Sequence, residues 1–420
     1  MNVYEILEEV KLHIKPDFKK LKEVDLFIEK INRLLKKAKI KAVCVPGGSY
    51  AKGTFLKNDF DVDLFVRFDY SYADEDISQL LGSVLMPFKP VIVHGSRDYY
   101  QLKNAFTYEI IPVLNVTDYT KVKNVTDMSP LHVDYVKSQL DRKPTLAEEI
   151  RLAKQFCKSQ GCYGAESYIA GFSGHVLDIL IIHYGSLLTL LSAAANDWKK
   201  KKIIDPGLHL DNPEKELNKA KTDSPLILVD PIQPDRNAAA ALSEEKYAGF
   251  KKAAKAFLDN PSQSFFVIRT IDEAYLKEVK AQYGESVLVR VNIIPAEGKP
   301  DVAGAKAHKV YEFLKKEITE KGFVTYASGW QFLPSTILYY IVKKEELSEL
   351  EERMGPPTRS KRHYKEFITK HAENELFIKN SRVHAYVKRK HTTIKGLISA
   401  LLDSSYVKER VEKIQSVRFL

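Results

Sequence analysis

The chain has few cysteines for its 420 residues. Cys44, Cys157 and Cys162 have the spacing of neither a zinc site nor a disulfide framework. We therefore interpret them as reduced thiols and expect a cytoplasmic protein.

Long apolar runs are absent too. The most apolar long segment, residues 176–191, is interrupted by Asp178 and His183, so it is too short and too polar to span a bilayer. The N-terminus carries acidic residues and lacks the apolar centre of a signal peptide. There is also no internal repeat and no low-complexity linker. These absences predict an intracellular protein that does not act at a membrane.

Positive charge is abundant. The formal net charge is +10 and the isoelectric point is near 9.1, which favours a polyanionic partner. Residues 356–395 contain eleven Lys and Arg against three Glu. This segment is compatible with nucleic-acid binding and equally with an ordinary solvated face.

The length and the 44% hydrophobic content predict about three globular domains. Mixed strand and helix patterns indicate an α/β head over 1–135, which includes strands at 41–45, 61–68, 91–94 and 105–116 and a helix near 75–85. Helical patterns dominate 136–257, with helices at 148–158 and 176–195 and an alanine-rich helix after 237. The remaining residues, 258–420, predict strands at 264–268, 286–291, 323–327 and 336–342 and helices at 305–320, 345–354 and 361–371. The expected fold class is α+β multidomain.

The most informative motif runs from Gly48 to Asp63. Gly48-Ser49 forms a turn that offers backbone N–H groups and a hydroxyl to a phosphate. Asp61 and Asp63 begin a strand and point to the same face, because side chains two residues apart on a strand do so. Two neighbouring carboxylates repel each other unless a cation, usually a divalent metal ion, lies between them. The motif predicts metal-dependent nucleotidyl transfer.

Such a site needs a third carboxylate. Glu109, in the strand-like run before Pro112, is the best candidate, and Asp59 is a lesser one. The alternative for Glu109 is a surface acid on an edge strand.

Further residues are candidates for phosphate or nucleotide contacts, each with an ordinary alternative. Lys52 is otherwise a surface lysine, and Lys154 with the nearby Tyr163 is otherwise part of a solvated helix face. His132 either binds phosphate or caps a helix start. Arg236, beside Asn237 at an expected helix start, holds a base edge or a phosphate, or only begins a helix.

Aromatic residues are interleaved with the basic residues of the tail. Bases stack on aromatic rings while phosphates pair with Lys and Arg, so this pattern suits RNA ends. The helical spacing of Tyr364 and Phe367 is equally compatible with a core. The aromatic residues are Tyr364, Phe367, Phe377 and Tyr386.

Taken together, the motifs resemble the archaeal (class I) CCA-adding enzymes, tRNA nucleotidyltransferases of the polymerase-β-like superfamily. The Gly-Ser and Asp-x-Asp motif marks the superfamily, and the central motifs narrow the resemblance to the family. The motifs that carry it are Gly48–Thr54, Asp61–Asp63, Ser129–His132, Arg151–Lys154, Gly161–Glu166, Gly171–Gly174, Val229–Pro231, Arg236–Asn237 and Arg353–Pro356.

The resemblance implies a polymerase-β-like head, a helical neck, and a body and tail that grip the acceptor–TΨC arm of tRNA. Asp61, Asp63 and Glu109 would hold two Mg²⁺ ions. CTP and ATP would be the substrates, the RNA 3′-hydroxyl would attack the α-phosphate, and a homodimer is one possible assembly. The residues implied in nucleotide binding are Gly48, Ser49, Lys52, Ser129, His132, Lys154, Tyr163 and, for the base, Arg236. Those expected to contact RNA are Arg359, Lys361, Arg362, Lys388, Arg389 and Lys390.

Three positions depart from the family pattern. Glu109 stands where the third carboxylate is usually Asp; its longer side chain can still ligate a metal ion, and the sequence leaves the rate and the metal preference open. Lys52 replaces a common Arg and so offers a point charge instead of a bidentate fork. Ser129 replaces a common Thr and keeps the hydroxyl.

Two other functions remain as alternatives. A poly(A) polymerase or an oligoadenylate synthetase would keep the head motif but add only A. An RNA-binding protein with a degenerate active site is the alternative from another class, and the intact Asp61 and Asp63 argue against it.

Overall fold

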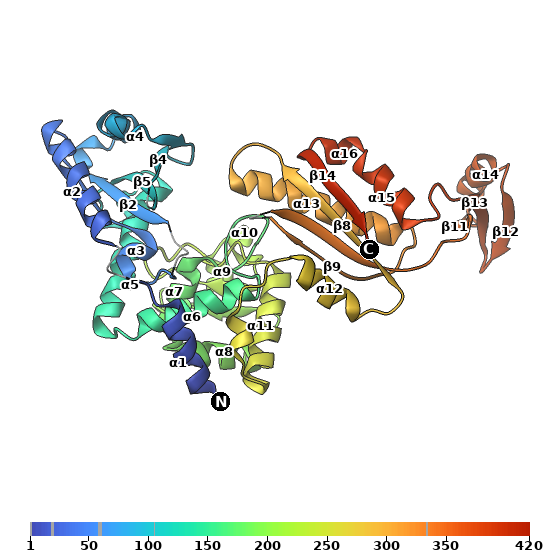
Figure 1. Ribbon diagram of the computed structural model, residues 1–420, viewed down its shortest axis with the longest axis horizontal. Coiled ribbons are helices and arrows are strands. Elements are labelled where there is room, and N and C mark those ends of the chain that lie inside the picture. The colour runs from blue at the N-terminus through green and yellow to red at the C-terminus, as the bar shows by residue number, and fades with distance from the viewer. Residues whose placement is uncertain (1, 18–20, 58–60, 105, 333–334) are drawn as a thin grey trace. The chain divides into compact units, whose positions relative to one another are not determined.

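The computed structural model describes residues 2–17, 21–57, 61–104, 106–332 and 335–420. The chain divides into two compact units, Met1–Ile268 and Arg269–Leu420 (Figure 1).

The first unit contains a five-stranded mixed sheet with the spatial order β1-β2-β5-β4-β3. Strands β2 and β5 run parallel, and the other neighbouring pairs are antiparallel. The strands are β1 (Ala42–Pro46), β2 (Val62–Phe68), β3 (Val91–Val93), β4 (Tyr99–Lys103) and β5 (Thr107–Leu114).

Both faces of strand β2 are covered, which explains its nearly continuous apolar sequence. On one face, Leu64 packs in a core with residues of α2 (Lys22–Lys37) and α4 (Ile77–Leu85). On the other face, Phe65 packs with Val133 of α5 (Met128–Arg142). Residue 63 shares this second face with residue 65, so the sheet presents its carboxylate on the side that α5 covers.

The structure confirms the strands and the helix predicted within residues 41–116, with shifts of a few residues at their ends. The predicted turn at Gly48 is a short helix, α3 (Gly48–Lys52). Strand β4 was not predicted, because it is short and only Tyr100 and Leu102 face the core. Residue 59, the lesser candidate for a third carboxylate, lies outside the described residues.

A helical layer forms the rest of the first unit, and its helices gather around one apolar core (Figure 1). Helix α1 belongs to this core through Ile6, Leu7, Val10 and Ile14, although it opens the chain. The main helices are α1 (Val3–Ile14), α6 (Leu146–Ser159), α7 (Gly174–Tyr184), α8 (Leu187–Asn196) and α11 (Glu244–Asp259). Short elements complete the layer: β6 (Lys202–Ile204), β7 (Leu226–Leu228), α9 (Pro213–Glu216) and α10 (Lys219–Thr222).

The helix predicted over residues 176–195 is two helices. Gly185 ends α7 in the left-handed region at φ +82°, and Ser186 begins α8 by accepting a hydrogen bond from Thr189 N. In the part of the chain that the structure describes, no single helix is long and apolar enough to cross a membrane. The pair α7 and α8 passes this test only when joined, and the two helices are bent by 92°.

The prediction of a strand at residues 264–268 is wrong. Residues Gln263–Phe266 form a 3-10 helix, capped by Ser262, which accepts a hydrogen bond from Ser264 N. Phe265 and Phe266 both pack against the ring of Phe156. Neighbouring residues of a strand point to opposite faces, so burying both rings in one core favours the turn.

The second unit contains a four-stranded antiparallel sheet with the order β14-β8-β10-β9. The predicted strands and the long helix α13 are confirmed, and strand β14 was not predicted. The elements are β8 (Ser286–Pro295), β9 (Thr325–Gln331), β10 (Thr336–Lys343), β14 (Val411–Phe419), α12 (Glu273–Ala281), α13 (Pro300–Glu320), α15 (Ile394–Leu402) and α16 (Ser405–Lys408).

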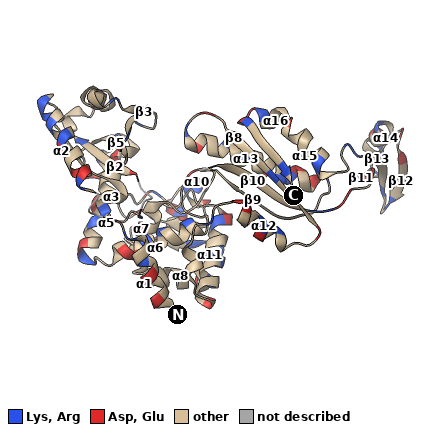
Figure 2. Cartoon of the chain, in the orientation of Figure 1, with Lys and Arg blue, Asp and Glu red and all other residues tan. Residues whose placement is uncertain are grey.

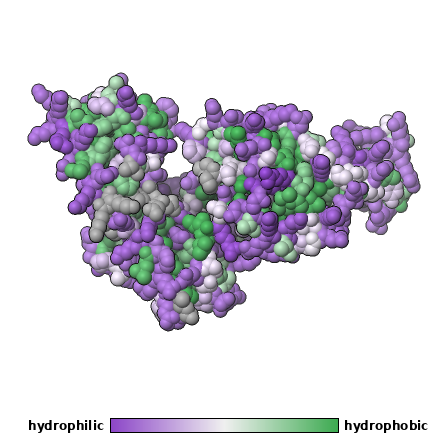
Figure 3. Space-filling view, in the orientation of Figure 1, coloured by the Kyte–Doolittle hydropathy of each residue, from purple (hydrophilic) through white to green (hydrophobic). Residues whose placement is uncertain are grey.

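A three-stranded antiparallel sheet, which we call the tail sheet, also lies in the second unit. It consists of β11 (Leu350–Pro357), β13 (Arg382–Lys388) and β12 (Glu375–Lys379), and α14 (Lys361–Lys370) packs on β11. Figure 3 shows mostly hydrophilic residues over its visible face. The predicted helix at 345–354 is wrong, because residues 350–354 pair with β13. Pairing along a whole strand outweighs the helix propensity of a short Glu-rich segment.

Candidate active site

Two acidic side chains lie side by side on neighbouring strands of the first sheet. Asp63 of β2 stands opposite Glu109 of β5 in the parallel register, and Gln101 Nε2 lies 3.4 Å from Glu109 Oε1. Asp61, just before β2, is exposed and lines the same pocket. The structure therefore brings together the three predicted carboxylates, and Glu109 is not on an edge strand.

This pocket has a volume of about 250 Å³. Acidic residues, basic residues and a few apolar side chains share its walls. The lining residues are Ser49, Phe55, Leu56, Asp61, Asp63, Glu109, Lys154, Lys158 and Tyr163.

The carboxylates of the pocket carry excess negative charge. Burial, and then the charge of Asp61, raises the pKa of Asp63 to about 6, although Lys52 and Lys154 partly oppose this. Burial, and then Asp63 and Asp61, raises the pKa of Glu109 to about 7. Three oxygen ligands whose charges repel one another suit a hard divalent cation such as Mg²⁺.

Helix α3 brings the Gly-Ser motif against Asp63. Gly47 N donates to Asp63 O at 2.8 Å, and the Asp63 carboxylate accepts a hydrogen bond from the backbone N–H of Ser49. Gly48 has φ +48°, and a Cβ atom there would lie 1.6 Å from Asp63 Oδ2. Only glycine allows this close approach, so the motif's glycine keeps room for the carboxylate.

Two lysines lie behind the pocket around a buried aspartate. Lys52 pairs with Asp178 of α7, whose side chain is fully buried. Lys154 Nζ lies 3.9 Å from the other Asp178 oxygen and donates to Thr54 O and Oγ1, both at 3.1 Å. The surface and solvated-face alternatives for Lys52 and Lys154 are therefore wrong, since their side chains are 10% and 4% exposed.

In this network, burial and the attraction between opposite charges shift the pKa values in opposite directions. Burial lowers the pKa of Lys154 to about 8, and Asp178 partly restores it. Burial alone would raise the pKa of Asp178, but Lys52 and Lys154 outweigh it and lower that pKa. Sequence reasoning missed Asp178, because its partners Lys52 and Lys154 are distant in the chain.

Tyr163 and Lys158 also line the pocket. Lys158 Nζ lies 4.8 Å from the centre of the Tyr163 ring. Sequence reasoning missed Lys158 as well, although it lies one helical turn after Lys154 on α6. The pocket therefore has one more cation than the motif comparison predicted.

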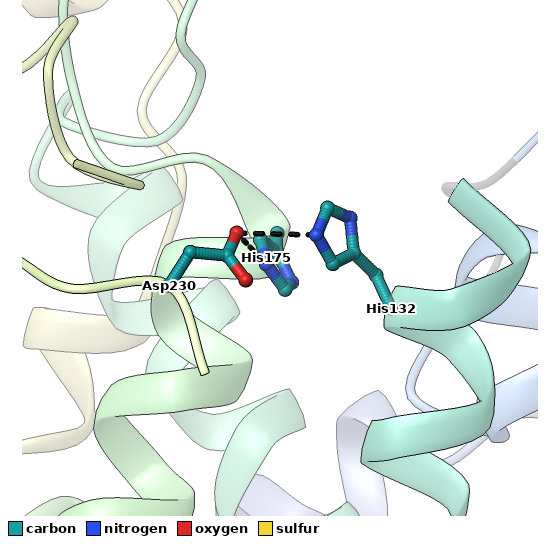
Figure 4. A group of neighbouring side chains, drawn as sticks. All are labelled: His132, His175 and Asp230. Carbon is teal, nitrogen blue, oxygen red and sulfur yellow. Dashed lines mark hydrogen bonds and ion pairs between the residues drawn. The ribbon is translucent and has the colours of Figure 1, made fainter. Parts of the chain in front are cut away.

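A second cluster surrounds Asp230, whose side chain is fully buried, and Figure 4 shows two imidazole rings directed toward it. His132 Nε2 of α5 lies 3.1 Å from Asp230 Oδ2, and His175 Nε2 of α7 lies 3.2 Å from the same oxygen. Arg236 Nη1 donates to that oxygen at 2.9 Å. Burial would raise the pKa of Asp230, but the two histidines beside it outweigh burial and lower the pKa well below its usual range.

The structure corrects the prediction that Arg236 and Asn237 start an alanine-rich helix. They lie in a turn, and the next helix, α11, begins only at Glu244. Asn237 is buried and accepts hydrogen bonds from Leu228 N and Ala239 N. These contacts hold the turn against β7, so the local alanine content does not decide its conformation.

His132 does not cap a helix start, because it lies one turn inside α5. Ser129 lies in the first turn of the same helix and is partly buried. The structure thus places every predicted nucleotide-binding residue in the first unit, around either the carboxylate pocket or the Asp230 cluster, or, for Ser129, on α5 beside His132.

The six residues predicted to contact RNA lie in the second unit, around the tail sheet and α14. Arg359, Lys361, Lys388 and Lys390 are exposed. Lys and Arg alternate with acidic residues here (Figure 2). Arg362 Nε donates to Glu366 at 3.0 Å, while Arg389 contacts Glu351 and Lys321 O.

Three of the four tail aromatics make ring contacts within the protein. Phe377 stacks on Tyr386 with their ring centres 4.8 Å apart, and Phe367 lies 4.5 Å from the ring of His371. Phe377, Tyr386 and Tyr364 are nevertheless only partly buried, so their rings are not lost in a core.

Comparison with protein families matches three successive parts of the chain. A nucleotidyltransferase domain matches residues 24–152, and the second domain of tRNA nucleotidyltransferase matches residues 148–267. The C-terminal domain of the CCA-adding enzyme matches residues 300–417.

Curated relatives match nearly the whole chain. The CCA-adding enzyme of Methanococcus maripaludis (strain C7) is 30% identical and covers 96% of this chain, which spans 92% of that protein. The CCA-adding enzyme of Nanoarchaeum equitans is 32% identical, with coverage of 89% and 88%. That of Methanocaldococcus jannaschii is 29% identical, with coverage of 96% and 92%.

Solved structures support the fold alone. A cytoplasmic RNA terminal U-transferase is 17% identical with a TM-score of 0.51, covering 64% of this chain and 98% of that one. The Cid1 poly(U) polymerase with Mg and 3′-dATP is 16% identical with a TM-score of 0.52, covering 63% and 98%. The predicted α+β fold with a nucleotidyltransferase head is confirmed. The chain belongs to the archaeal CCA-adding enzymes, a family of tRNA nucleotidyltransferases.

Proposed function

We propose that the family's reaction, template-independent addition of CCA to the 3′ end of tRNA, takes place in the carboxylate pocket of the first unit. One observation carries this proposal: Asp63 and Glu109 stand side by side in parallel strands, in a pocket that Lys154 and Ser49 also line. Ligands for a metal ion and donors for a phosphate thus meet in one place.

The nucleotidyltransferase family generally uses divalent metal ions, and we propose that two Mg²⁺ ions bind Asp61, Asp63 and Glu109. The residues fit such ions, because they offer only oxygen ligands and because burial, and then the neighbouring carboxylates, raise the pKa values of Asp63 and Glu109. When bound, the ions would supply Lewis-acid activation of the attacking hydroxyl and neutralise charge on the phosphates.

The chain's own cations would bind the triphosphate. Lys154 and Lys158 line the pocket, and Lys52 lies beside Asp178, so positive charge converges on one side of it. We propose that Ser49, Tyr163, Ser129 and His132 contact the sugar and phosphates and that Arg236 reads the base. The long side chain of Glu109 keeps the third ligand role despite the common Asp of the family.

In the reaction, the oxygen of the RNA 3′-hydroxyl forms a bond to the α-phosphorus of CTP or ATP. The bond between this phosphorus and the pyrophosphate oxygen breaks, and the hydroxyl proton is released. The pocket's residues would hold the two reactants in line, which is the main contribution of protein groups to phosphoryl-type transfer.

We further propose a functional division into a head (1–135), a neck (136–257) and a body with a tail (258–420). Exposed cations of the second unit, among them Arg359, Lys361, Lys388 and Lys390, support binding of the acceptor–TΨC arm of tRNA. Arg362 and Arg389 would join them by exchanging acidic partners for phosphates.

Two features support proposals about dimerisation and about the compartment in which the protein works. Edge strand β3 exposes Val91 and Ile92, which a second copy would cover in a homodimer. Sedimentation velocity would test this. The three cysteines are free and buried, which supports work in a reducing compartment such as the cytoplasm.

The test of the proposed function uses tRNA that lacks its last one, two or three nucleotides. The protein is incubated with Mg²⁺ and with CTP, ATP or both, and the products are sequenced. We expect two C additions followed by one A, and no extension of tRNA that already ends in CCA.

Long A tails on these RNAs would contradict the proposal in favour of a poly(A) polymerase. Equal extension of unrelated RNA oligonucleotides would contradict the tRNA assignment. RNA binding without any incorporation would favour the non-catalytic alternative.

A further inference from the structure

Asp230 is held rigidly by its own loop. Its side chain is fully buried, and Oδ1 accepts hydrogen bonds from Ile232 N at 3.0 Å and Gln233 N at 3.3 Å. Its backbone N–H donates to Arg236 O at 3.0 Å. The loop therefore closes on itself, and the direction of Oδ2 is fixed.

This fixed oxygen orients Arg236. Arg236 Nη1 donates to Oδ2 at 2.9 Å, and the Arg236 side chain is 41% exposed while Asp230 is fully buried. One end of the guanidinium is thus tied down and the rest faces solvent. A guanidinium is planar, so fixing one N–H group and the backbone defines where the other donors point.

The two histidines complete the arrangement from two other helices. His175 Nε2 donates to Oδ2 at 3.2 Å, and His132 Nε2 lies 3.1 Å from it without hydrogen-bond geometry (Figure 4). Their rings lie 4.2 Å apart. His175 therefore holds the carboxylate by a contact from a second element, α7.

The side chains of His132, His175 and Asp230 have the ligand types of a transition-metal site, and their ligand atoms lie within 4.8 Å of one another. However, the guanidinium of Arg236 already brings a positive charge to Oδ2. A metal ion at this oxygen would have to displace that charge, so the contacts favour a network made of protein groups alone.

We propose that Asp230 and His175 are positioning residues for base selection, because they fix the direction in which Arg236 presents its free N–H groups. This inference rests on the proposed function, in which Arg236 meets the base. Arginine has donors only, so it donates to the ring nitrogens of cytosine (N3) and adenine (N1) but finds no acceptor at the N–H groups that uracil and guanine carry there. Arg236 discriminates strongly against uracil and guanine only if its N–H donors are held in one direction.

Asp230→Asn tests the inference with almost no change of shape. The backbone N–H groups of Ile232 and Gln233 require an acceptor, so the amide oxygen would face them and the NH₂ group would face Arg236. Asp235→Asn is the matched control, because it removes the same charge from the same loop at an exposed position, where the side chain pairs with Lys221. The measurement is kcat/KM for CTP, ATP, UTP and GTP on tRNA lacking CCA.

We expect Asp230→Asn to lower kcat/KM for CTP and ATP about 10- to 100-fold, mainly through KM, and to lower the CTP:UTP and ATP:GTP ratios at least tenfold. His175→Leu should lower the same ratios several-fold. His175→Gln, which keeps an N–H donor, should recover most of what the Leu variant loses. Asp235→Asn should match the wild type.

Equal losses for all four nucleotides in Asp230→Asn would overturn the inference, since a merely structural role lowers activity without changing selectivity. If Asp230→Asn does not fold, equal selectivity of His175→Leu and the wild type would overturn it instead. Failure of the proposed function looks different. In that case the wild type adds no CCA, or Arg236→Leu keeps full selectivity.

Discussion

Carboxylates occur in two opposite electrostatic environments in the first unit. Asp63 and Glu109 share an open pocket with Asp61, and their pKa values are raised to about 6 and about 7. Asp178 and Asp230 are fully buried, yet their pKa values are lowered. Burial raises the pKa in both groups. In the first group the neighbouring carboxylates add to this effect, whereas each carboxylate of the second meets at least two basic groups that outweigh it.

This contrast separates two tasks of the same residue type. A group of carboxylates without sufficient positive charge is destabilising by itself and is suited to take up a cation. A compensated carboxylate already holds its cations and fixes their positions. We therefore propose that Asp61, Asp63 and Glu109 serve in binding and that Asp178 and Asp230 arrange the basic groups around the substrate.

The largest expected effect is in the open pocket. Asp63→Asn should lower nucleotide incorporation at least about a thousandfold, equivalent to about 4 kcal/mol of transition-state stabilisation, because it removes a metal ligand. Single-turnover extension of tRNA measures this, and filter binding should show unchanged tRNA affinity. Asp74→Asn, at a side chain that is 94% exposed, is the control. Activity surviving in Asp63→Asn would refute the ligand assignment.

Removing the charge of a compensated carboxylate should lower the free energy of unfolding. Asp178→Asn leaves Lys52 and Lys154 without their buried counter-charge, and removing one partner of a buried ion pair costs about 3–5 kcal/mol. Denaturant unfolding of the first unit can be followed by the fluorescence of the buried Trp198 in a Trp330→Phe background. ATP should restore part of the loss, because its phosphates can replace the carboxylate.

The control for that experiment is Asp74→Asn in the same unit, whose aspartate is 94% exposed and pairs with an exposed lysine. It should change the unfolding free energy by less than about 1 kcal/mol. Equal stability of Asp178→Asn and this control would show that the buried lysines do not depend on Asp178.

Neutralising one carboxylate of the open pocket should instead raise the free energy of unfolding. The folded-state pKa of Glu109 is raised from 4.5 to about 7. The folded protein therefore binds this proton more tightly than the unfolded chain, and stability falls as the pH rises from about 4.5 through 7. Above pH 7, Glu109→Gln should stabilise the metal-free protein by about 1–2 kcal/mol, after allowance for solvent screening.

Unfolding curves with EDTA at pH 5 and pH 8 measure this effect, which should be small at pH 5. Mg²⁺ should stabilise the wild type more than the variant. Glu245→Gln, at a side chain that is 86% exposed, should show neither effect. A loss of stability at pH 8 in Glu109→Gln would mean that the pocket's negative charge is already compensated.

The smallest expected effect concerns Lys158, which lies over the Tyr163 ring at the pocket wall. Lys158→Met should raise KM for CTP and ATP about three- to tenfold and leave kcat nearly unchanged, because it removes binding energy that ground state and transition state share. Lys255→Met on the same layer, at an exposed position, is the control. A fall in kcat with constant KM would assign Lys158 to the chemical step instead.

The sequence predicted the open pocket well, because its signals are local or lie in one sheet. The run of strand-type residues after Asp61 identifies β2, and Glu109 follows from the need for a third acid on a neighbouring strand. The roles of these residues in metal binding stay predictions.

The compensated carboxylates could not be predicted. Asp178 meets a lysine 126 residues away, and His175 and Asp230 are 55 residues apart. No periodic pattern encodes such pairs. For the same reason the segment 345–354 was predicted as a helix, whereas its pairing with β13 makes it a strand.

Binding of Mn²⁺, measured by electron paramagnetic resonance at pH 8, tests most directly which carboxylates await a cation. The account predicts that Asp63→Asn loses the tight sites and that Asp230→Asn keeps them. It also predicts weaker binding in the wild type at pH 6, where Glu109 and part of Asp63 are protonated. Unchanged binding in Asp63→Asn together with lost binding in Asp230→Asn would contradict it, and would place the metal ion between His132, His175 and Asp230.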